Sequence, residues 1–207
     1  MKKGTLLYGQ SGGPSAVINA SAYGVIKEAL SHQDQITEVL VMRHGIQGAL
    51  NEDFIKVNEY IDQLELLPMT PGSAFGSIRH KMAEYRVDDT EYAKLLEVFK
   101  KYNVRYFLYN GGNDSMDTAH KIAEYMRRVG YEVNVIGVPK TIDNDLPHID
   151  HTPGYGSAAK YIANTIMEIN ADMYAYPKGK VTIVEIMGRH AGWLTAASHI
   201  ASLEGFG

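Results

Sequence analysis

Cysteine is absent from this sequence, which excludes disulfide bonds, thiolate zinc sites and a cysteine nucleophile. No stretch approaches the roughly 18 apolar residues expected of a membrane-spanning helix. The apolar run from Thr5 to Tyr8 is too short for the core of a signal peptide. Lysine and arginine form no dense cluster of the kind that binds nucleic acid. We therefore expect a cytoplasmic protein with neither a membrane nor a nucleic acid as a partner.

The remaining composition is that of an ordinary globular protein. The 207 residues are 45% hydrophobic and 21% charged, which is enough apolar material for a sizeable core. The formal net charge of -4 is compatible with phosphate binding, because a few backbone N–H groups and one or two basic side chains suffice to hold a phosphate.

Short apolar runs alternate with helical patterns along the whole chain. Runs at 5–9, 36–42, 104–109, 133–138 and 181–187 predict strands, and patterns at 16–30, 92–102, 115–129, 155–169 and 191–203 predict helices. Strands that alternate with helices predict a three-layer α/β/α fold with a mostly parallel sheet. Ligands of such sheets bind at the carboxyl ends of the strands, so the turns after the strands are the candidate sites.

The Pro- and His-rich stretch from Leu146 to Pro153 predicts a domain boundary. We expect a donor-binding domain at residues 1–153 and the start of a second domain at 154–207. The sequence reaches Gly207 just after a predicted helix, where the pattern favours another strand. We therefore expect the second domain to be incomplete.

The first candidate turn contains Gly12 and Gly13 between a strand and a helix. Backbone amides can approach an anion there, although a tight turn closed by Ser15 would give the same pattern. The segment also matches G-x-S-x-G, the nucleophile elbow of serine hydrolases, with Ser11 as nucleophile. We favour this reading less, because only eight residues precede Gly9 and leave no earlier strand to carry an oxyanion loop.

Two further turns carry acidic side chains. Asn113 and Asp114 follow a glycine pair and open a helix, where they would serve either as a helix cap or beside a phosphate and its metal. Asp143 and Asp145 alternate after Lys140, and in an extended segment they would point to the same side. One carboxylate could accept a proton there while the other holds an ion, although a polar loop without a function is the plainer alternative.

A fourth turn pairs Gly188 with Arg189, and Gly76 to Arg79 is another glycine-rich segment that ends in arginine. A guanidinium in such a place can bind a phosphate, although a surface arginine is the plainer reading. The segment Gly154 to Ala159 matches G-x-G-x-x-A but follows no predicted strand, so the dinucleotide-binding reading fails. His148 and His151 could pair on a metal, but two histidines in a proline-flanked loop are more often ordinary loop residues.

Together these segments resemble the phosphofructokinase family. The resemblance extends over essentially all 207 residues, and the segments fall in the family's order and approximate spacing. They are Ser11-Gly12-Gly13, Gly76-Ser77-Ile78-Arg79, Gly111-Gly112-Asn113-Asp114-Ser115, Thr141-Ile142-Asp143-Asn144-Asp145 and Met187-Gly188-Arg189. The last two are highly specific in combination.

The resemblance implies a role for each matched residue. Asp143 would be the general base that takes the proton from the 1-hydroxyl of fructose 6-phosphate, and Arg79 and Lys140 would offset phosphoryl charge. The implied donor-binding residues are Gly12, Gly13, Asp114 and Lys140. The implied sugar-phosphate residues are Thr141, Ile142, Asp143, Met187, Gly188 and Arg189. The implied Mg²⁺ residues are Asn113 and Asp145.

Two positions bear on the phosphoryl donor. ATP-using members resemble Gly-Gly-Asp-Gly-Ser and Pro-Gly-Thr-Ile-Asp-Asn-Asp. In this chain, Asp114 replaces the third glycine of the first motif, and Lys140 replaces the glycine of the second. Asp114 would repel the α-phosphate of ATP, and Lys140 would compensate the charge of bare pyrophosphate. Two other positions depart from the family: Asn113 replaces the usual aspartate, and Lys180 stands where ATP-using members have an arginine.

The resemblance thus implies the N-terminal part of a glycolytic, Mg²⁺-dependent phosphotransferase that uses pyrophosphate and forms homo-oligomers at full length. ATP is the alternative donor. Two other classes remain open: a serine hydrolase, which an active-site serine probe would label at Ser11, and a non-catalytic phosphometabolite-binding subunit, which would bind without turnover.

Overall fold

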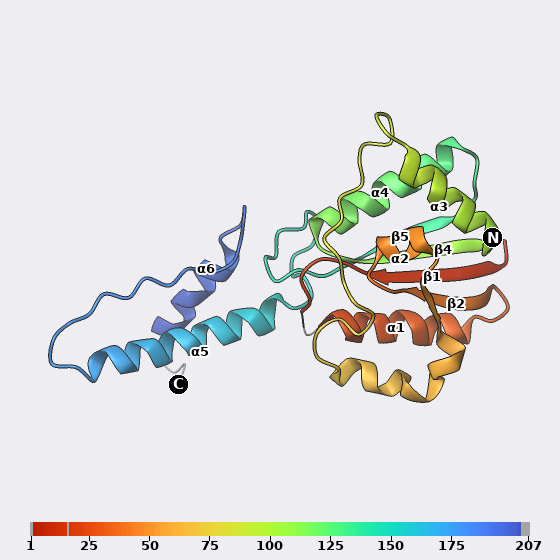
Figure 1. Cartoon of the computed structure of the whole chain (residues 1–207). Helices are drawn as coiled ribbons and strands as arrows, with labels where there is room; N and C mark the ends of the chain where they lie inside the picture. Colours follow the sequence, from red (N-terminus) through yellow and green to blue (C-terminus); the bar gives the residue numbers. More distant parts are fainter. Residues whose placement is uncertain (1, 16, 204–207) are drawn as a thin grey trace. The chain divides into compact units, whose positions relative to one another are not determined.

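The computed structural model describes residues 2–15 and 17–203, and the chain forms two compact units, residues 1–140 and 141–207. In the first unit, a sheet is covered by helices on both faces (Figure 1). Among the described residues, no helix is both long and apolar enough to cross a lipid bilayer.

The first unit is built on a five-stranded sheet with the order β3-β2-β1-β4-β5. Its strands are β1 (Gly4–Gln10), β2 (Ile36–Met42), β3 (Phe54–Lys56), β4 (Val104–Gly111) and β5 (Asn134–Pro139). Strands β1, β2, β4 and β5 run parallel, and β3 pairs antiparallel with β2. The predicted mostly parallel sheet is therefore confirmed.

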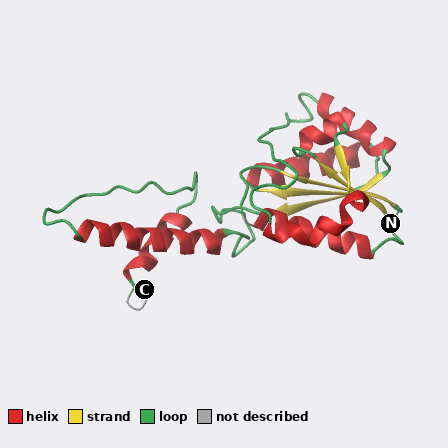
Figure 2. Ribbon diagram, turned by 60° about the horizontal axis from the view of Figure 1, so that its bottom comes forward, coloured by secondary structure: helices red, strands yellow, loops and turns green. Residues whose placement is uncertain are grey.

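Helices form a layer on each face of this sheet. Figure 2 shows the strands in yellow between the two layers of helices in red. One layer contains α1 (Val17–Ser31) and the 3₁₀ segment η1 (Val57–Met69). The other contains α2 (Ile46–Asn51), α3 (Thr90–Lys101) and α4 (Asn113–Arg128). The three-layer α/β/α arrangement expected from the sequence is confirmed for this unit.

Side chains of β1 alternate between the two cores, as a pleated strand requires. Leu6 and Tyr8 pack in the core under α1, and Leu7 packs in the core under α3 and α4. Full burial of one such side chain stabilises the fold by roughly 1.5–3 kcal/mol. This packing holds β1 in place up to its last residue, Gln10, which precedes the turn at Gly12 and Gly13.

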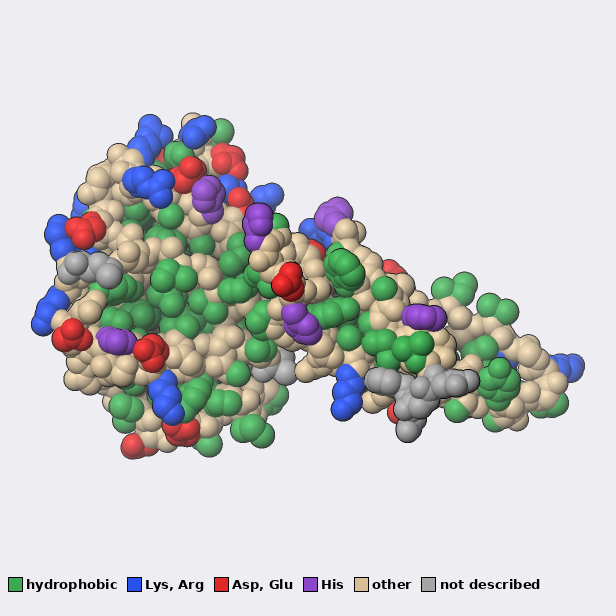
Figure 3. Space-filling view, turned by 180° about the vertical axis from the view of Figure 1, so that it is seen from behind, with side chains coloured by type: hydrophobic (Ala, Val, Ile, Leu, Met, Phe, Trp, Pro, Cys, Tyr) green, Lys and Arg blue, Asp and Glu red, His purple; other side chains and the backbone are tan. Residues whose placement is uncertain are grey.

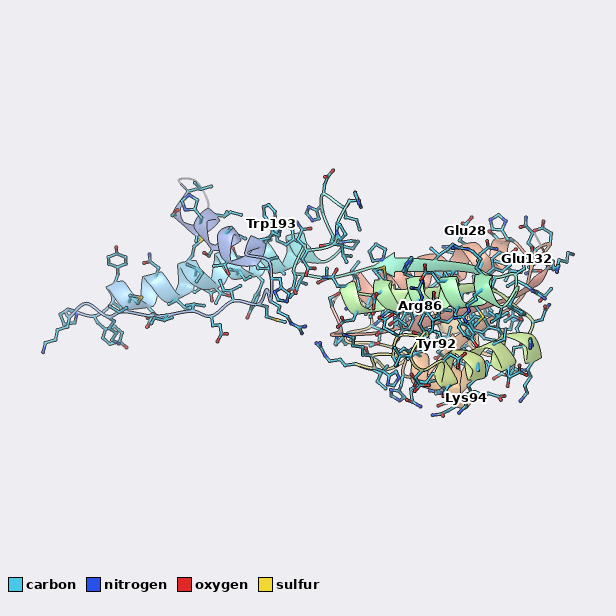
Figure 4. All side chains as sticks on the ribbon, turned by 90° about the horizontal axis from the view of Figure 1, so that it is seen from above. Glu28, Arg86, Tyr92, Lys94, Glu132 and Trp193 are labelled. Carbon is cyan, nitrogen blue, oxygen red and sulfur yellow. The ribbon has the colours of Figure 1, made fainter. Side chains whose placement is uncertain are left out.

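A ring cluster and a buried lysine tie the loop before α3 to α4. Tyr92 is fully buried against Tyr85 and Tyr125, with ring centroids 5.9 and 5.3 Å away; Figure 4 labels it in the first unit. Lys121 of α4 pairs with Glu84 and Asp117, each over 2.6 Å. These contacts anchor the far end of the irregular segment between η1 and α3.

Three elements of the first unit were not predicted from the sequence: α2, β3 and η1. Helix α2 has only six residues and β3 only three, which is too short for a hydrophobic period to be visible. The 3₁₀ segment η1 includes Pro68, and Tyr60 within it has a non-helical backbone. The other helices of this unit match the predicted ones within a few residues, and Ala16 lies outside the described residues.

The second unit contains α5 (Tyr155–Tyr174), α6 (Trp193–Ala197) and the 3₁₀ segment η2 (Ser198–Ser202). Helix α5 begins where it was predicted and runs further. The single helix predicted at 191–203 is instead split into α6 and η2. Figure 4 labels Trp193 at the first position of α6.

The strand predicted at 181–187 is wrong. These residues form no sheet pairing with any described residue, although their apolar run is typical of a buried strand. Val181 and Ile183 are instead 93% and 91% exposed, and hydrophobic side chains are visible on the surface of the second unit in Figure 3. A strand needs a neighbour for its N–H and C=O groups, and the described part of the second unit offers none.

The two units divide before Thr141, earlier than the boundary predicted after Pro153. The segment from Thr141 to Pro153 folds on itself. The hydroxyl of Thr152 donates to the main-chain oxygen of Thr141 over 2.8 Å and to Oδ1 of Asn144 over 2.9 Å. The segment therefore belongs to the second unit.

Candidate active site

The turn after β1 holds two glycines beside two cations of the first unit. Gly12 has a φ of 79°, which glycine adopts without steric cost. A Cβ on Gly12 would lie 3.5 Å from Nζ of Lys140, and one on Gly13 would lie 3.2 Å from Nη2 of Arg79. The missing side chains thus leave room next to an ammonium and a guanidinium.

Three hydrogen bonds fasten the segment before Arg79 to this turn. The amide of Gly12 donates to the carbonyl of Ile78 over 3.1 Å, and Oγ of Ser11 donates to the same carbonyl over 3.2 Å. Oγ of Ser77 donates to the carbonyl of Gly12 over 2.5 Å. Because the Gly12 amide is already engaged, the attraction for an anion comes from the side-chain cations more than from this N–H. The sequence had suggested the reverse.

Lys140 follows β5 and lies in the wall of the same turn. Its backbone amide donates to the carbonyl of Gly111 over 2.9 Å, and Nζ donates to the carbonyl of Gly13 over 2.5 Å. The residue is only 4% exposed, and a buried ammonium needs such polar partners. Strand register explains the proximity, because Gly111 pairs with Pro139 at the carboxyl end of β5.

The turn between β4 and α4 completes this face. A Cβ on Gly111 would lie 2.0 Å from Oγ of Ser115 and 3.1 Å from the main-chain oxygen of Ser11, so only glycine fits. Helix α4 begins at Asn113, and the side chains of Asn113 and Asp114 are exposed. A helix N-terminus attracts anions, whereas the carboxylate of Asp114 places a negative charge in the first turn of α4.

Ser11 lacks the surroundings of a nucleophile. Its residue is 6% exposed, and its hydroxyl donates to the carbonyl of Ile78 and interacts with the hydroxyl of Tyr109. Burial raises the pKa of Tyr109, so this phenol stays protonated at neutral pH. Among the hydrogen bonds of the described residues, none joins Ser11 to a histidine, the partner that a Ser-His-Asp triad requires.

In the second unit, Asp143 and Asp145 lie in a turn rather than an extended segment. Asn144 between them has a φ of 54°, which breaks the alternation that would place both carboxylates on one side. The expectation of alternating side chains is therefore wrong. Asn144 adopts this backbone because its Oδ1 accepts the amide of Thr152 over 2.7 Å, and the amide of Asp143 donates to Oγ1 of Thr141 over 3.2 Å.

Thr152 and Asn144 thus hold the shape of the Thr141–Asp145 loop, and the sequence reasoning missed Thr152. The residue is fully buried, with its hydroxyl and its amide both hydrogen-bonded within the loop. A threonine immediately before Pro153 carries no distinctive sequence signal. Its role becomes visible only when the loop closes.

The second unit also brings the two predicted sugar-phosphate segments together. Ile142 and Met187 line one groove of about 260 Å³. Its other lining residues are Ala158, Tyr161, Ile162, Thr165, Ile166, Val184, Glu185, Ile186 and Leu194. Gly188 has a φ of 141°, and a Cβ there would lie 2.3 Å from the main-chain oxygen of Ala191. Arg189 follows this tight turn and is exposed.

Residues that could hold a metal by themselves were not found in the described part of the chain. No three histidine or acidic side chains cluster there, and His148 and His151 gain no third ligand. Mg²⁺ usually keeps several waters and binds through one or two carboxylates together with substrate phosphates. The amide oxygen of Asn113 in the first unit and the carboxylate of Asp145 in the second unit are each donors of the type that such a site uses.

Comparisons with known proteins identify the family of this chain. The sequence profile of the family described as "PFK: Phosphofructokinase" matches residues 5–205. A pyrophosphate–fructose 6-phosphate 1-phosphotransferase of Xanthomonas campestris pv. campestris is 50% identical over 204 residues, which are 97% of this chain and 48% of that protein. One of Halomonas elongata is 46% identical over 204 residues, 97% of this chain and 49% of that protein.

A solved structure gives the same result at the level of the fold. The pyrophosphate-dependent phosphofructokinase of Marinobacter aquaeolei superposes with a TM-score of 0.84 at 49% identity, over 97% of this chain and 50% of that one. The chain therefore spans about half the length of the relatives that it matches. The profile match over nearly all of its residues, with the glycine turns and cations described above, shows that this chain belongs to the phosphofructokinase family.

Proposed function

We propose that the protein transfers a phosphoryl group from pyrophosphate to the 1-hydroxyl of fructose 6-phosphate, with this chain providing the donor site and part of the sugar site. The observation that carries the proposal is the pair of cations, Arg79 and Lys140, beside Gly12 and Gly13. Pyrophosphate carries several negative charges on a small group, and two neighbouring cations match it well. The relatives at 46–50% identity bear the name of this activity.

The donor side favours pyrophosphate over ATP because of charge. The exposed carboxylate of Asp114 at the start of α4 would lie close to the α-phosphate of a bound ATP. Like charges at that position disfavour ATP. The ammonium group of Lys140, held by its hydrogen bond to the carbonyl of Gly13, compensates the charge of bare pyrophosphate.

The chemistry assigned to the acceptor side is proton removal. The 1-hydroxyl oxygen attacks the terminal phosphorus, the bond from that phosphorus to the bridging oxygen breaks, and orthophosphate leaves with the bond's electron pair. Asp143 accepts the hydroxyl proton, while Arg79 and Lys140 offset charge on the phosphoryl oxygens. Thr141, Ile142 and the segment Met187–Arg189 bind the sugar phosphate.

Mg²⁺ is the cofactor of the proposed reaction. The ion neutralises charge on the phosphoryl oxygens when it is bound. Asp145 and the amide oxygen of Asn113 are the side chains of this chain that would help to hold it, with the donor phosphates providing further ligands. The proposal also includes a homo-oligomeric, cytoplasmic enzyme.

A coupled assay of the full-length protein tests the proposal. Fructose 1,6-bisphosphate should form with pyrophosphate and Mg²⁺, far faster than with ATP. Calorimetry with pyrophosphate separates this function from a non-catalytic subunit, which would bind the ligand without turnover. Labelling of Ser11 by an active-site serine probe would favour the hydrolase instead.

A further inference from the structure

Two fully buried amide side chains, Gln10 and Asn19, join the core of the first unit to the loop that carries Arg79. We propose that they are positioning residues: they hold this loop so that the Arg79 guanidinium lies beside Gly13. The inference deepens the proposed function and rests on the role that it gives to Arg79. Neither amide faces the glycine turn as a ligand, so their effect would pass entirely through the loop.

The loop needs such support because it has no regular structure of its own. Between Met69 and Thr90 the chain forms neither helix nor strand. Its backbone N–H and C=O groups therefore lack the partners that a helix or sheet would provide. Some of these partners are backbone groups, such as the amide of His44, which donates to the carbonyl of Phe75 over 2.9 Å. Side chains from outside the loop supply others.

Asn19, on α1, supplies three of these partners. Its Nδ2 donates to the carbonyls of Thr70 and Gly72 over 2.7 and 3.1 Å. Its Oδ1 accepts the amide of Ala74 over 3.0 Å. One amide group thus binds three successive points of the loop, much as a neighbouring strand would.

Gln10, at the end of β1, extends the same network. Its Nε2 donates to Oδ1 of Asn19 over 3.1 Å and to the carbonyl of Ile18 over 3.2 Å. Its Oε1 accepts the hydroxyl of Ser73 over 2.6 Å and the amide of Phe75 over 3.4 Å. Both polar atoms of the Gln10 amide and both of the Asn19 amide are hydrogen-bonded, which favours a single arrangement of a buried polar network.

From this network a continuous set of hydrogen bonds leads to the residue before Arg79. The hydroxyl of Ser73 also donates to the carbonyl of Gly76 over 2.9 Å. The next two residues, Ser77 and Ile78, bind the glycine turn as described above. Displacement of the loop at Ser73 would therefore move the guanidinium relative to Gly13.

A double-mutant cycle on the full-length protein tests this. Asn19→Ala should lower kcat by roughly tenfold to a hundredfold, the scale of a misplacement of about 1 Å. In the Arg79→Ala background, the same change should lower kcat by less than about twofold, because the group that it positions is gone. Equal losses in both backgrounds would overturn the inference.

Amide hydrogen exchange gives a second readout that does not depend on catalysis. In Asn19→Ala, the amides of Ala74 and Gly12 should exchange at least about tenfold faster. The Ala74 amide loses its acceptor, Oδ1 of Asn19, and the hydrogen bond from the Gly12 amide to the carbonyl of Ile78 is weakened when the loop moves. Unchanged protection of Gly12 would overturn the inference whatever the kinetics show. If Arg79→Ala leaves kcat unchanged while Gly12 exchanges faster, the catalytic role of Arg79 fails but the attachment of the loop stands.

Two further variants complete the design. Ser73→Ala removes the contacts of one hydroxyl with Oε1 of Gln10 and the carbonyl of Gly76 but keeps both amides. It should show the same pattern more weakly, so it serves if Asn19→Ala does not fold. Tyr131→Phe is the matched control. It removes hydrogen bonds of 2.8 and 3.0 Å to the carbonyls of Phe99 and Val104, at the opposite end of the sheet. It should lower the melting temperature by a few degrees without changing kcat or the exchange of Gly12, and an equal loss of kcat here would contradict the inference.

Discussion

The ammonium group of Lys140 donates a hydrogen bond to the main-chain carbonyl of Gly13 over 2.5 Å. The cation is thus held at the glycine turn by the protein itself, and no anion is needed to bring it there. Charge that is in place before the substrate arrives costs no reorganisation during the reaction. The predictions that follow test this site and the fold around it.

The first prediction concerns the choice of donor. With wild-type full-length protein, kcat/KM for pyrophosphate should exceed that for ATP by at least about a hundredfold, because Asp114 repels the nucleotide. Asp114→Gly combined with Lys140→Gly should reverse much of this preference. Steady-state assays with both donors measure it. Each single variant serves as a control, and a wild-type protein that prefers ATP would contradict the donor assignment.

The second prediction concerns the general base. Asp143→Asn should lower kcat about a hundredfold or more, the scale of general-base loss, while circular dichroism and the melting temperature stay unchanged. Asp150→Asn is the matched control, since this exposed carboxylate lies in the same segment. A nearly normal kcat for Asp143→Asn would remove Asp143 from the mechanism.

The third prediction concerns Lys121, which is 8% exposed. Its hydrogen bonds to Asp117 and then Glu84 raise its pKa above the ordinary value. A raised pKa means that the ion pairs stabilise the fold fully below the unfolded pKa of about 10.4. This stability is then lost as the pH rises towards the folded pKa.

Lys121→Met should therefore cost roughly 1 kcal/mol at pH 7, and the difference from wild type should shrink above about pH 10. Urea denaturation at both pH values measures it. Lys94→Met is the control, because Lys94 is an exposed lysine of α3, labelled in Figure 4. A difference that does not depend on pH would show that Lys121 stabilises only through packing.

The fourth prediction concerns the apolar surface of the second unit. Val181 and Ile183 are almost fully exposed, and unpaired extended segments of this kind associate. The 207-residue chain should self-associate in sedimentation experiments, and Val181→Lys with Ile183→Lys should reduce this. Val87→Lys, at an 87% exposed position of the first unit, should have no effect. A wild-type chain that sediments as a monomer at high concentration would refute the prediction.

Much of the first unit could be predicted from the sequence because its central strand β1 is buried on both faces. A strand such as β1, covered by helices on each side, reads as a continuous apolar run. The same reasoning failed at 181–187, where the run is equally apolar. Pairing depends on a neighbouring strand, and an apolar pattern does not reveal whether that neighbour is present.

The candidate site was predictable as a set of turns but not as an arrangement. Glycines after strands marked the segments at Gly12 and Gly111, and polar side chains marked Asp114 and Asp143. The sequence did not reveal that Arg79 lies beside Gly13, since this contact depends on the path of an irregular loop. The one available signal was Gln10, an amide at the end of an apolar strand. A polar side chain in such a place indicates a buried hydrogen-bond partner, here the loop at Ser73 and Phe75.

The hydrogen bonds that shape the donor site join parts of the chain that are far apart in sequence. Ser77 and Gly12 are 65 residues apart, Ser11 and Ile78 are 67 apart, and Lys140 and Gly13 are 127 apart. Contacts of such long range form late, because loop closure must precede them. During refolding, these hydrogen bonds, and with them the proposed ability to bind pyrophosphate, should therefore return only after the bulk of the secondary structure has formed.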